Sequence, residues 1–153
     1  MKVTAFTFFL AVLFILLCFP LHSQSDLIID HLLEEKNAGF GNAVYIVLTA
    51  VEEIPTDTSL QNAVLHLADK NWKLKQRDID EPIRVGEFSL IVLKAFSIKG
   101  GIFFRIFPTP RYAAREFVYL DLIPYDRNPY GYISGEEVLY IVGKMLDMTG
   151  KRL

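Results

Sequence analysis

The chain has 153 residues, of which 52% are hydrophobic, 13% aromatic and 22% charged, and its formal net charge is −2. This composition excludes an intrinsically disordered protein, because disorder requires low hydrophobicity and high net charge. The small negative charge offers no basic field that could hold nucleic acid, and the single cysteine excludes an intramolecular disulfide. The sequence therefore predicts one folded domain that does not bind nucleic acid.

The first residues have the layout of a secretory signal peptide. A positive charge precedes an apolar run over residues 5–17, and Pro20 ends that run. We expect residues 1–23 to be removed, with cleavage as late as 25, and residues 26–150 to form a single domain. A lipid on Cys18 and an uncleaved anchor remain as alternatives, since a spanning helix needs about 17 residues. The protein is then periplasmic or secreted, and it contacts a membrane only if this segment stays uncleaved or carries a lipid at Cys18.

Short helices are expected along most of the domain. Residues 26–36 read as a helix with one apolar face. Residues 43–51 are almost entirely apolar, which fits a buried helix or a buried strand, and Asn42 as an N-cap favours the helix. Ser59 can cap the next helix. The helix after the following polar connection carries an apolar stripe of Phe88, Ile91, Val92, Ala95 and Phe96.

The C-terminal half contains a strand-like run and two further helices. Residues 102–107 form a short apolar run that ends at Pro108, and they are the best candidate for a strand. Pro110 suits the first turn of a helix over 111–122, because that turn does not need its N–H. These elements predict a mostly α fold, a compact bundle of five to six short helices. The last helix is capped by Ser134 and has a core stripe of Val138, Ile141, Val142, Met145 and Leu146.

Two helix–loop–helix units are visible, over residues 60–96 and 112–146. In each, an apolar residue leads into a helix whose third or fourth position is Glu, within Ile83-Arg84-Val85-Gly86-Glu87 and Ile133-Ser134-Gly135-Glu136-Glu137. This layout resembles the S-layer homology (SLH) module, a helix–loop–helix unit of secreted bacterial envelope proteins. The second helix of that module opens with an Ile-Thr-Arg-Ala-Glu-like signature. The resemblance covers roughly residues 42–147, and it implies an SLH-like domain that binds cell-wall polysaccharide.

The most distinctive local cluster lies around residue 111. Arg111 and Arg115 are four residues apart, and so are Tyr112 and Glu116, so each pair shares a helix face. Two guanidinium groups on one face can hold a carboxylate or phosphate of a glycan, while Tyr112 stacks on a sugar. The alternative is that both arginines pair with Asp or Glu of the fold. Residues 102–116 also look similar to uncharacterised exported spirochaetal proteins, which implies a periplasmic location.

The loop before the last helix has a second interpretation as a calcium site. Its spacing partly matches an EF-hand loop, in which oxygen atoms at fixed positions surround Ca²⁺. The alternative is a loop that ends in a serine N-cap, with a glutamate at the third helical position, and this is the interpretation that we favour. The candidate calcium ligands are Asp126, Asn128, the Tyr132 carbonyl, Ser134 and Glu137.

Catalytic motifs are absent from the sequence, which contains no nucleophile elbow, zinc-protease motif or phosphate-binding loop. His31 and His66 are the only histidines after the predicted cleavage site, and we expect them at the surface or at helix boundaries. The sequence therefore predicts a non-enzymatic envelope module without a cofactor, whose partner is a cell-wall glycan or an envelope protein. A Ca²⁺-binding protein is the alternative.

Overall fold

The computed structural model describes residues 24–75 and 77–150, so the predicted signal peptide lies outside the described residues. The described part is helical, and its only β-type pairing consists of two isolated bridges. The prediction of a mostly α bundle is therefore confirmed. The helices are α2 (Gln24–Glu34), α3 (Phe40–Ala50), α4 (Leu60–Asp69), α5 (Val85–Ala95), α6 (Ile102–Ile106), α7 (Pro110–Tyr119) and α8 (Gly135–Thr149).

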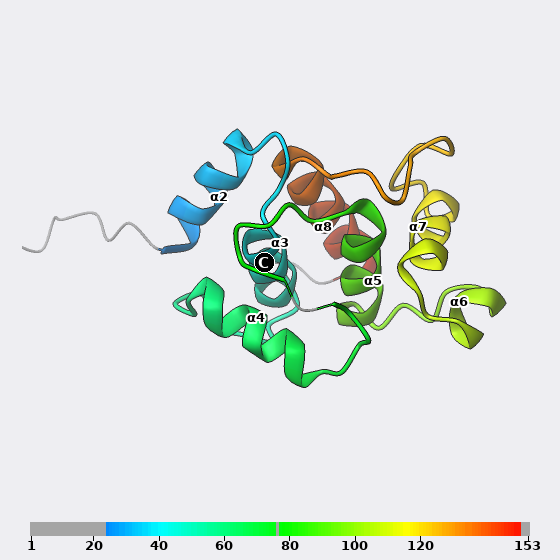
Figure 1. The fold of residues 1–153 in the computed structure, drawn as a ribbon, viewed down its shortest axis with the longest axis horizontal. Helices are drawn as coiled ribbons and strands as arrows, with labels where there is room; N and C mark the ends of the chain where they lie inside the picture. Colours follow the sequence, from blue (N-terminus) through cyan, green and yellow to red (C-terminus); the bar gives the residue numbers. More distant parts are fainter. Residues whose placement is uncertain (1–23, 76, 151–153) are drawn as a thin grey trace, which may run out of the picture.

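Within residues 24–150, apart from residue 76, the helices form three helix–loop–helix units, one more than the two that the sequence suggested. The additional unit consists of α2 and α3, and the others are α4 with α5 and α7 with α8. In Figure 1 the inner helices α3, α5 and α8 lie at the centre, and the outer helices α2, α4 and α7 lie around them. Each outer helix packs on the inner helix of the preceding unit: α4 on α3, α7 on α5, and α2 on α8. The units therefore close into a ring.

A triangle of backbone hydrogen bonds lies at the centre of this ring. Ala38 donates to the Ile133 carbonyl at 2.7 Å, Ile83 donates to Ala38 at 2.9 Å, and Ile133 donates to Ile83 at 3.4 Å. All three residues are buried, and each lies two positions before the first residue of an inner helix. The three bonds tie equivalent points of the three units together, so the ring has an approximate threefold repeat.

The first residue of each inner helix binds the loop of the next unit. Such N–H groups have no partner inside their own helix and need one elsewhere. The bonds join Phe40 to the Glu81 carbonyl at 2.8 Å, Val85 to Gly131 at 2.9 Å, and Gly135 to Glu35 at 3.0 Å. Contact is tightest at Gly135, where an added Cβ would lie 1.6 Å from the Leu32 carbonyl oxygen. Only glycine fits there.

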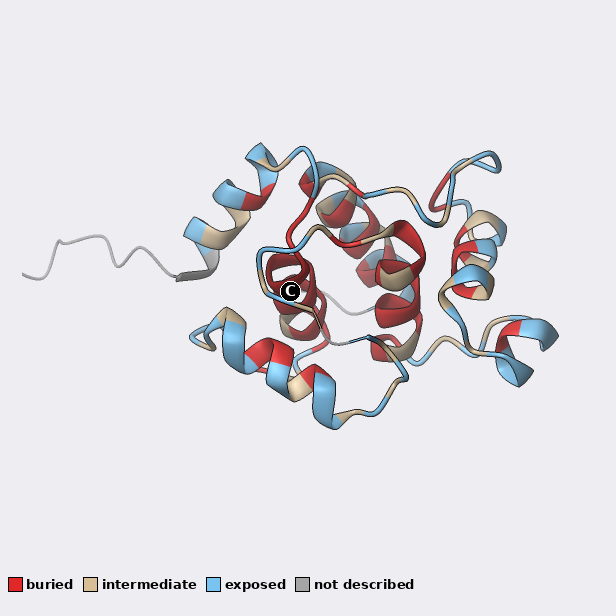
Figure 2. Ribbon diagram, viewed as in Figure 1, coloured by how far each residue is buried: buried red, intermediate tan, exposed pale blue. Residues whose placement is uncertain are grey.

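The inner helices supply most of the core, and their ribbons are coloured mainly as buried in Figure 2. Almost every residue of α3 is buried, which explains why an amphipathic pattern is missing from its sequence. The prediction of a helix here is confirmed, but Asn42 is not its cap. Gly39 is the N-cap, and the Asn42 amide donates from inside the helix to Glu35 Oε1 at 2.9 Å. Carbonyls of the neighbouring unit, Glu81 and Ile79, accept the first N–H groups of the helix and allow the earlier start, and this contact between units is not evident from the sequence.

The strand predicted for residues 102–107 is wrong, because Ile102–Ile106 form the short helix α6. Its apolar residues follow a helical period: Phe104 points into the core, while Ile102 and Ile106 share the opposite, exposed face. The following helix also differs slightly from the prediction, since α7 ends at Tyr119 instead of 122. No helix within residues 24–75 and 77–150 is long and apolar enough to cross a membrane.

The last helix confirms its prediction in detail. The Ser134 hydroxyl accepts the Glu137 N–H at 3.2 Å, and Glu137 Oε2 accepts the Ser134 N–H at 3.0 Å, which completes a capping box. Ser59 caps α4 in a similar way by accepting the Asn62 N–H at 3.3 Å. The predicted core stripe of α8 is buried, and it consists of Val138, Ile141, Val142, Met145 and Leu146.

Candidate functional site

An open groove lies between α7 and the loop over residues 124–130, and we call it the α7 groove. Its volume is about 600 Å³. It brings two of the predicted binding residues together with the loop that was the candidate calcium site. The lining residues are Arg111, Ala114, Arg115, Val118, Tyr119, Tyr125, Arg127, Pro129 and Tyr130.

The helical period of α7 positions the basic side of the groove. Pro110 occupies the first turn, and the apolar side of the helix, with Phe117 fully buried, packs on α5. Arg111, Arg115 and Tyr119 recur every four residues, so they form one exposed row along the helix. The two arginines therefore lie on one face of α7.

In the part of the chain that the structure describes, the two arginines of this row have no carboxylate partner. Among the described residues, neither Arg111 nor Arg115 takes part in an ion pair or a side-chain hydrogen bond, although other arginines of the chain do. The alternative prediction, that they pair with Asp or Glu of the fold, therefore has no support in this structure. Two guanidinium groups with free donors can each bind a carboxylate or phosphate through two parallel hydrogen bonds.

Arg127 forms the opposite wall, and its position is fixed by the fold. Its Nη2 donates to Glu137 Oε2 at 2.8 Å and to the Tyr132 carbonyl at 3.1 Å. The side chain is 33% exposed. The guanidinium group therefore combines a fixed position with partial access from the groove.

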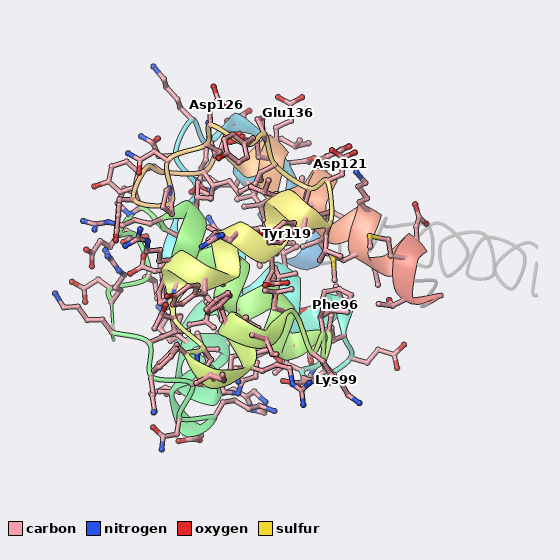
Figure 3. All side chains as sticks on the ribbon, turned by 90° about the vertical axis from the view of Figure 1, so that its right-hand side faces the viewer. Phe96, Lys99, Tyr119, Asp121, Asp126 and Glu136 are labelled. Atoms are coloured by element: carbon pink, nitrogen blue, oxygen red, sulfur yellow. The ribbon has the colours of Figure 1, made fainter. Side chains whose placement is uncertain are left out.

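Three tyrosines complete the α7 groove, and they are unusually exposed. Tyr119 is 73% exposed, Tyr125 is 92% exposed and Tyr130 is 60% exposed. In Figure 3, which faces α7, Tyr119 lies near the middle of this surface and Asp126 marks the loop above it. A tyrosine combines an apolar ring with a polar hydroxyl, so it can stack on a flat ligand while its edge stays hydrated. The groove is thus both basic and aromatic.

Tyr112 and Glu116 do not belong to the groove, in contrast to the predicted cluster. The Tyr112 ring stacks on Phe103 at a centroid distance of 6.0 Å and an interplanar angle of 10°. Glu116 Oε2 accepts the Gly101 N–H at 2.9 Å. Both side chains therefore hold α6 against α7. The helical spacing places Arg111 with Arg115 on one face of α7 and Tyr112 with Glu116 on another. Only the arginine pair lines the groove beside the loop.

Four of the five candidate calcium ligands, all except Asp126, are engaged with protein groups. Arg127 binds both Glu137 and the Tyr132 carbonyl, so a positive group already occupies the place that Ca²⁺ would need. Asn128 Oδ1 accepts the Tyr130 N–H at 3.0 Å, which is a turn bond. Across residues 24–75 and 77–150 there is no group of three or more His, Cys, Asp or Glu side chains suited to a metal ion.

The same arginine–glutamate clamp recurs in the second unit. Arg77 lies six residues before Ile83, as Arg127 lies six residues before Ile133. Arg77 Nη2 donates to Glu87 Oε1 at 3.0 Å, and Glu87 Oε2 accepts the Arg84 N–H at 3.2 Å. The recurrence identifies the clamp as part of the repeated fold. It also identifies the signal by which sequence reasoning could have found Arg127, namely alignment of the two units.

A second groove occupies the equivalent place beside α4, and we call it the α4 groove. Its volume is about 780 Å³. Gln61 and Leu65 stand at the helix positions that Arg111 and Arg115 hold in α7. Asp78 and Asp80 line its loop side. The repeat therefore produces two hollows of similar form, and only the α7 groove is basic and aromatic.

His31 and His66 lie apart from both grooves. His31 Nδ1 is 3.3 Å from Glu35 Oε1 on α2, and His66 Nε2 is 3.7 Å from Glu53 Oε2 beside α4. Burial raises the pKa of Tyr45, but this hydroxyl donates to the Thr56 carbonyl at 2.6 Å in the core. None of these groups lines the α7 groove.

Comparisons with protein-family models, with curated proteins and with solved structures give no match to this chain. The geometry of the α7 groove therefore carries the functional argument.

Proposed function

We propose that this chain is a non-enzymatic cell-envelope module that binds an anionic cell-wall polymer in the α7 groove. The observation that carries the proposal is the pair of exposed arginines, Arg111 and Arg115, which have no acidic partner in the described residues. In a protein with net charge −2, an uncompensated basic pair beside a hollow indicates an anionic ligand.

The chemistry of the groove suits a charged glycan. Arginine donors fit the carboxylates or phosphates of such a polymer, and the rings of Tyr119, Tyr125 and Tyr130 can stack on the apolar faces of its sugars. The groove is open, so a polymer can run through it in either direction. Nearby Glu116 and Glu137 are bonded to the fold, so neither supports a role as a catalytic acid or base.

The resemblance to the SLH module supports the same assignment. Modules of that family usually occur in several copies, and three helix–loop–helix units are present here. The predicted signal peptide would bring the domain to the envelope, where polymers of this kind are found. The alternative partner is an envelope protein with an acidic surface, which would meet the same arginines.

The proposal is tested by co-sedimentation with purified peptidoglycan sacculi. We expect the wild-type chain to be retained, and the variant Arg111→Gln with Arg115→Gln to lose at least tenfold in affinity, because two charge-assisted contacts disappear. The matched control is Gln61→Ala with Leu65→Ala, which changes the equivalent positions of the α4 groove. This control should bind as the wild type does.

Two results would contradict the proposal. Retention of the wild type no greater than that of an unrelated acidic protein would exclude peptidoglycan as the polymer and favour a protein partner. Equal loss in both double variants would show that the α7 groove is not the binding site.

A further inference from the structure

The helix α6 is an addition to the threefold ring. Residues 51–59 join α3 to α4, whereas the longer segment 96–109 joins α5 to α7 and contains α6. Residues 51–59 join two units of the ring without such a helix, so closure of the ring does not require α6. In Figure 1 it projects beyond α7 at the edge of the molecule. An element that the fold does not need, and that projects outward, invites a functional explanation.

The outer face of α6 is apolar and exposed. Phe104 is buried, at 3% exposure, while the opposite face is exposed apart from the ring contacts of Phe103 and Phe107 with Tyr112 of α7. Residues three and four positions apart are neighbours on a helix, so the exposed side chains form one continuous patch. They are Ile102 (67% exposed), Phe103 (59%), Ile106 (62%) and Phe107 (56%). A soluble protein rarely exposes such a group of large apolar side chains without a partner for it.

The sequence around this patch is basic, although the Glu116 carboxylate of α7 lies at the start of α6, where its Oε2 accepts the Gly101 N–H. From Phe88 to Arg115 the sequence contains five basic residues and no acidic residue, although the whole chain is acidic. Lys99 and Arg105 flank the patch and are exposed. Large apolar side chains next to lysine and arginine are typical of segments that insert into the headgroup region of an anionic bilayer.

We propose that α6 is an interfacial membrane anchor. Ile102, Phe103, Ile106 and Phe107 enter the boundary of the acyl chains, and Lys99 and Arg105 bind the anionic headgroups. The shape of α6 favours a bilayer over a protein, because a stable protein interface needs about 800 Å² per partner and α6 is a small projection of five residues. A fluid bilayer accepts such a convex wedge.

The location of α6 agrees with simultaneous access to the α7 groove. Figure 3 shows Lys99 at one end of the surface and Asp126, in the groove loop, at the other. With α6 in a membrane, this loop points away from the bilayer. The anchor does not require the N-terminal segment, which we expect to be removed, and it does not depend on the polymer-binding proposal.

A local fluorescent reporter tests the anchor in the full chain, where the N-terminal segment is also present. Cys18→Ser removes the native thiol, and Phe103→Cys carries nitrobenzoxadiazole, whose emission rises and shifts to the blue in an apolar environment. The matched control is Leu65→Cys, at a 57% exposed apolar position on α4. The probe is mixed with vesicles of phosphatidylglycerol and phosphatidylcholine in equal parts.

We expect emission at position 103 to rise with these vesicles and to be quenched by lipids brominated on the acyl chains, while position 65 stays unchanged. Lys99→Gln with Arg105→Gln should lower the affinity for these vesicles roughly 25-fold. Each basic residue near an anionic surface raises that affinity about fivefold. An unchanged signal at 103, or an equal rise at 65, would overturn the proposal. A rise with protein concentration in the absence of vesicles would assign the patch to a second copy instead.

Discussion

Glu137 has the sequence position of a calcium ligand, but its side chain stabilises the fold. Its Oε2 accepts hydrogen bonds from the Ser134 N–H at 3.0 Å and from Arg127 Nη2 at 2.8 Å. The first bond belongs to the cap of α8, and the second fixes Arg127 at the wall of the α7 groove. A carboxylate that is bonded in this way has little capacity left for a cation.

The cap of α8 should have a measurable energetic effect. Ser134→Ala removes the acceptor for the Glu137 N–H and should lower the free energy of unfolding by about 1 kcal/mol, as measured by urea denaturation. Glu136→Ala is the control, because Glu136 is exposed and forms no side-chain bond within the described residues; it should change stability by less than about 0.5 kcal/mol. Equal effects of the two substitutions would show that the cap contributes nothing specific.

Calcium should leave the melting temperature unchanged. The Arg127 guanidinium group already holds the Glu137 carboxylate and the Tyr132 carbonyl, so Ca²⁺ would have to displace it. Thermal melts of the wild type with and without millimolar Ca²⁺ should coincide, since even weak extracellular calcium modules bind in this range. The opposite result would be a Ca²⁺-dependent rise that Glu137→Gln abolishes.

At the scale of single elements, α8 contains two glycines in opposite situations. An added Cβ at Gly135 would meet the Leu32 carbonyl oxygen, whereas at Gly143 it would have no neighbour within 4 Å. Because glycine is a poor helix former, Gly143→Ala should raise the free energy of unfolding by roughly 0.5–1 kcal/mol.

Gly135→Ala should instead destabilise the protein severely, because α2 and α8 would have to separate. Both variants can be compared by chemical denaturation, and each serves as the reference for the other. Similar effects of the two substitutions would contradict the close packing of α8 on α2.

Local signals in the sequence predicted the elements unequally. The cap and the apolar stripe of α8 were predictable, because Ser134, Glu137 and the core residues follow rules that act within one or two turns. The start of α3 at Phe40 was not predictable, because Glu81 from the next unit binds its first N–H. The helix α6 was mistaken for a strand, since a short apolar run has no decisive period.

At the scale of the whole molecule, the threefold ring lies beyond local patterns. Its central bonds join Ala38, Ile83 and Ile133, which are far apart in the sequence and use only backbone atoms. The spacing of side chains along the sequence therefore does not predict these bonds. The candidate site was half predictable for the same reason: helical spacing paired Arg111 with Arg115, but the facing loop was known only from the fold.

Hydroxyl-radical footprinting of the protein on sacculi shows whether a polymer occupies the α7 groove, as we propose. Tyrosines inside and outside the groove are exposed in the free protein, so oxidation of each can be compared by mass spectrometry. We predict that binding protects Tyr119, Tyr125 and Tyr130, while Tyr132 and Tyr140 react as before. Protection spread evenly over all five residues, or confined to Tyr132 and Tyr140, would contradict this account.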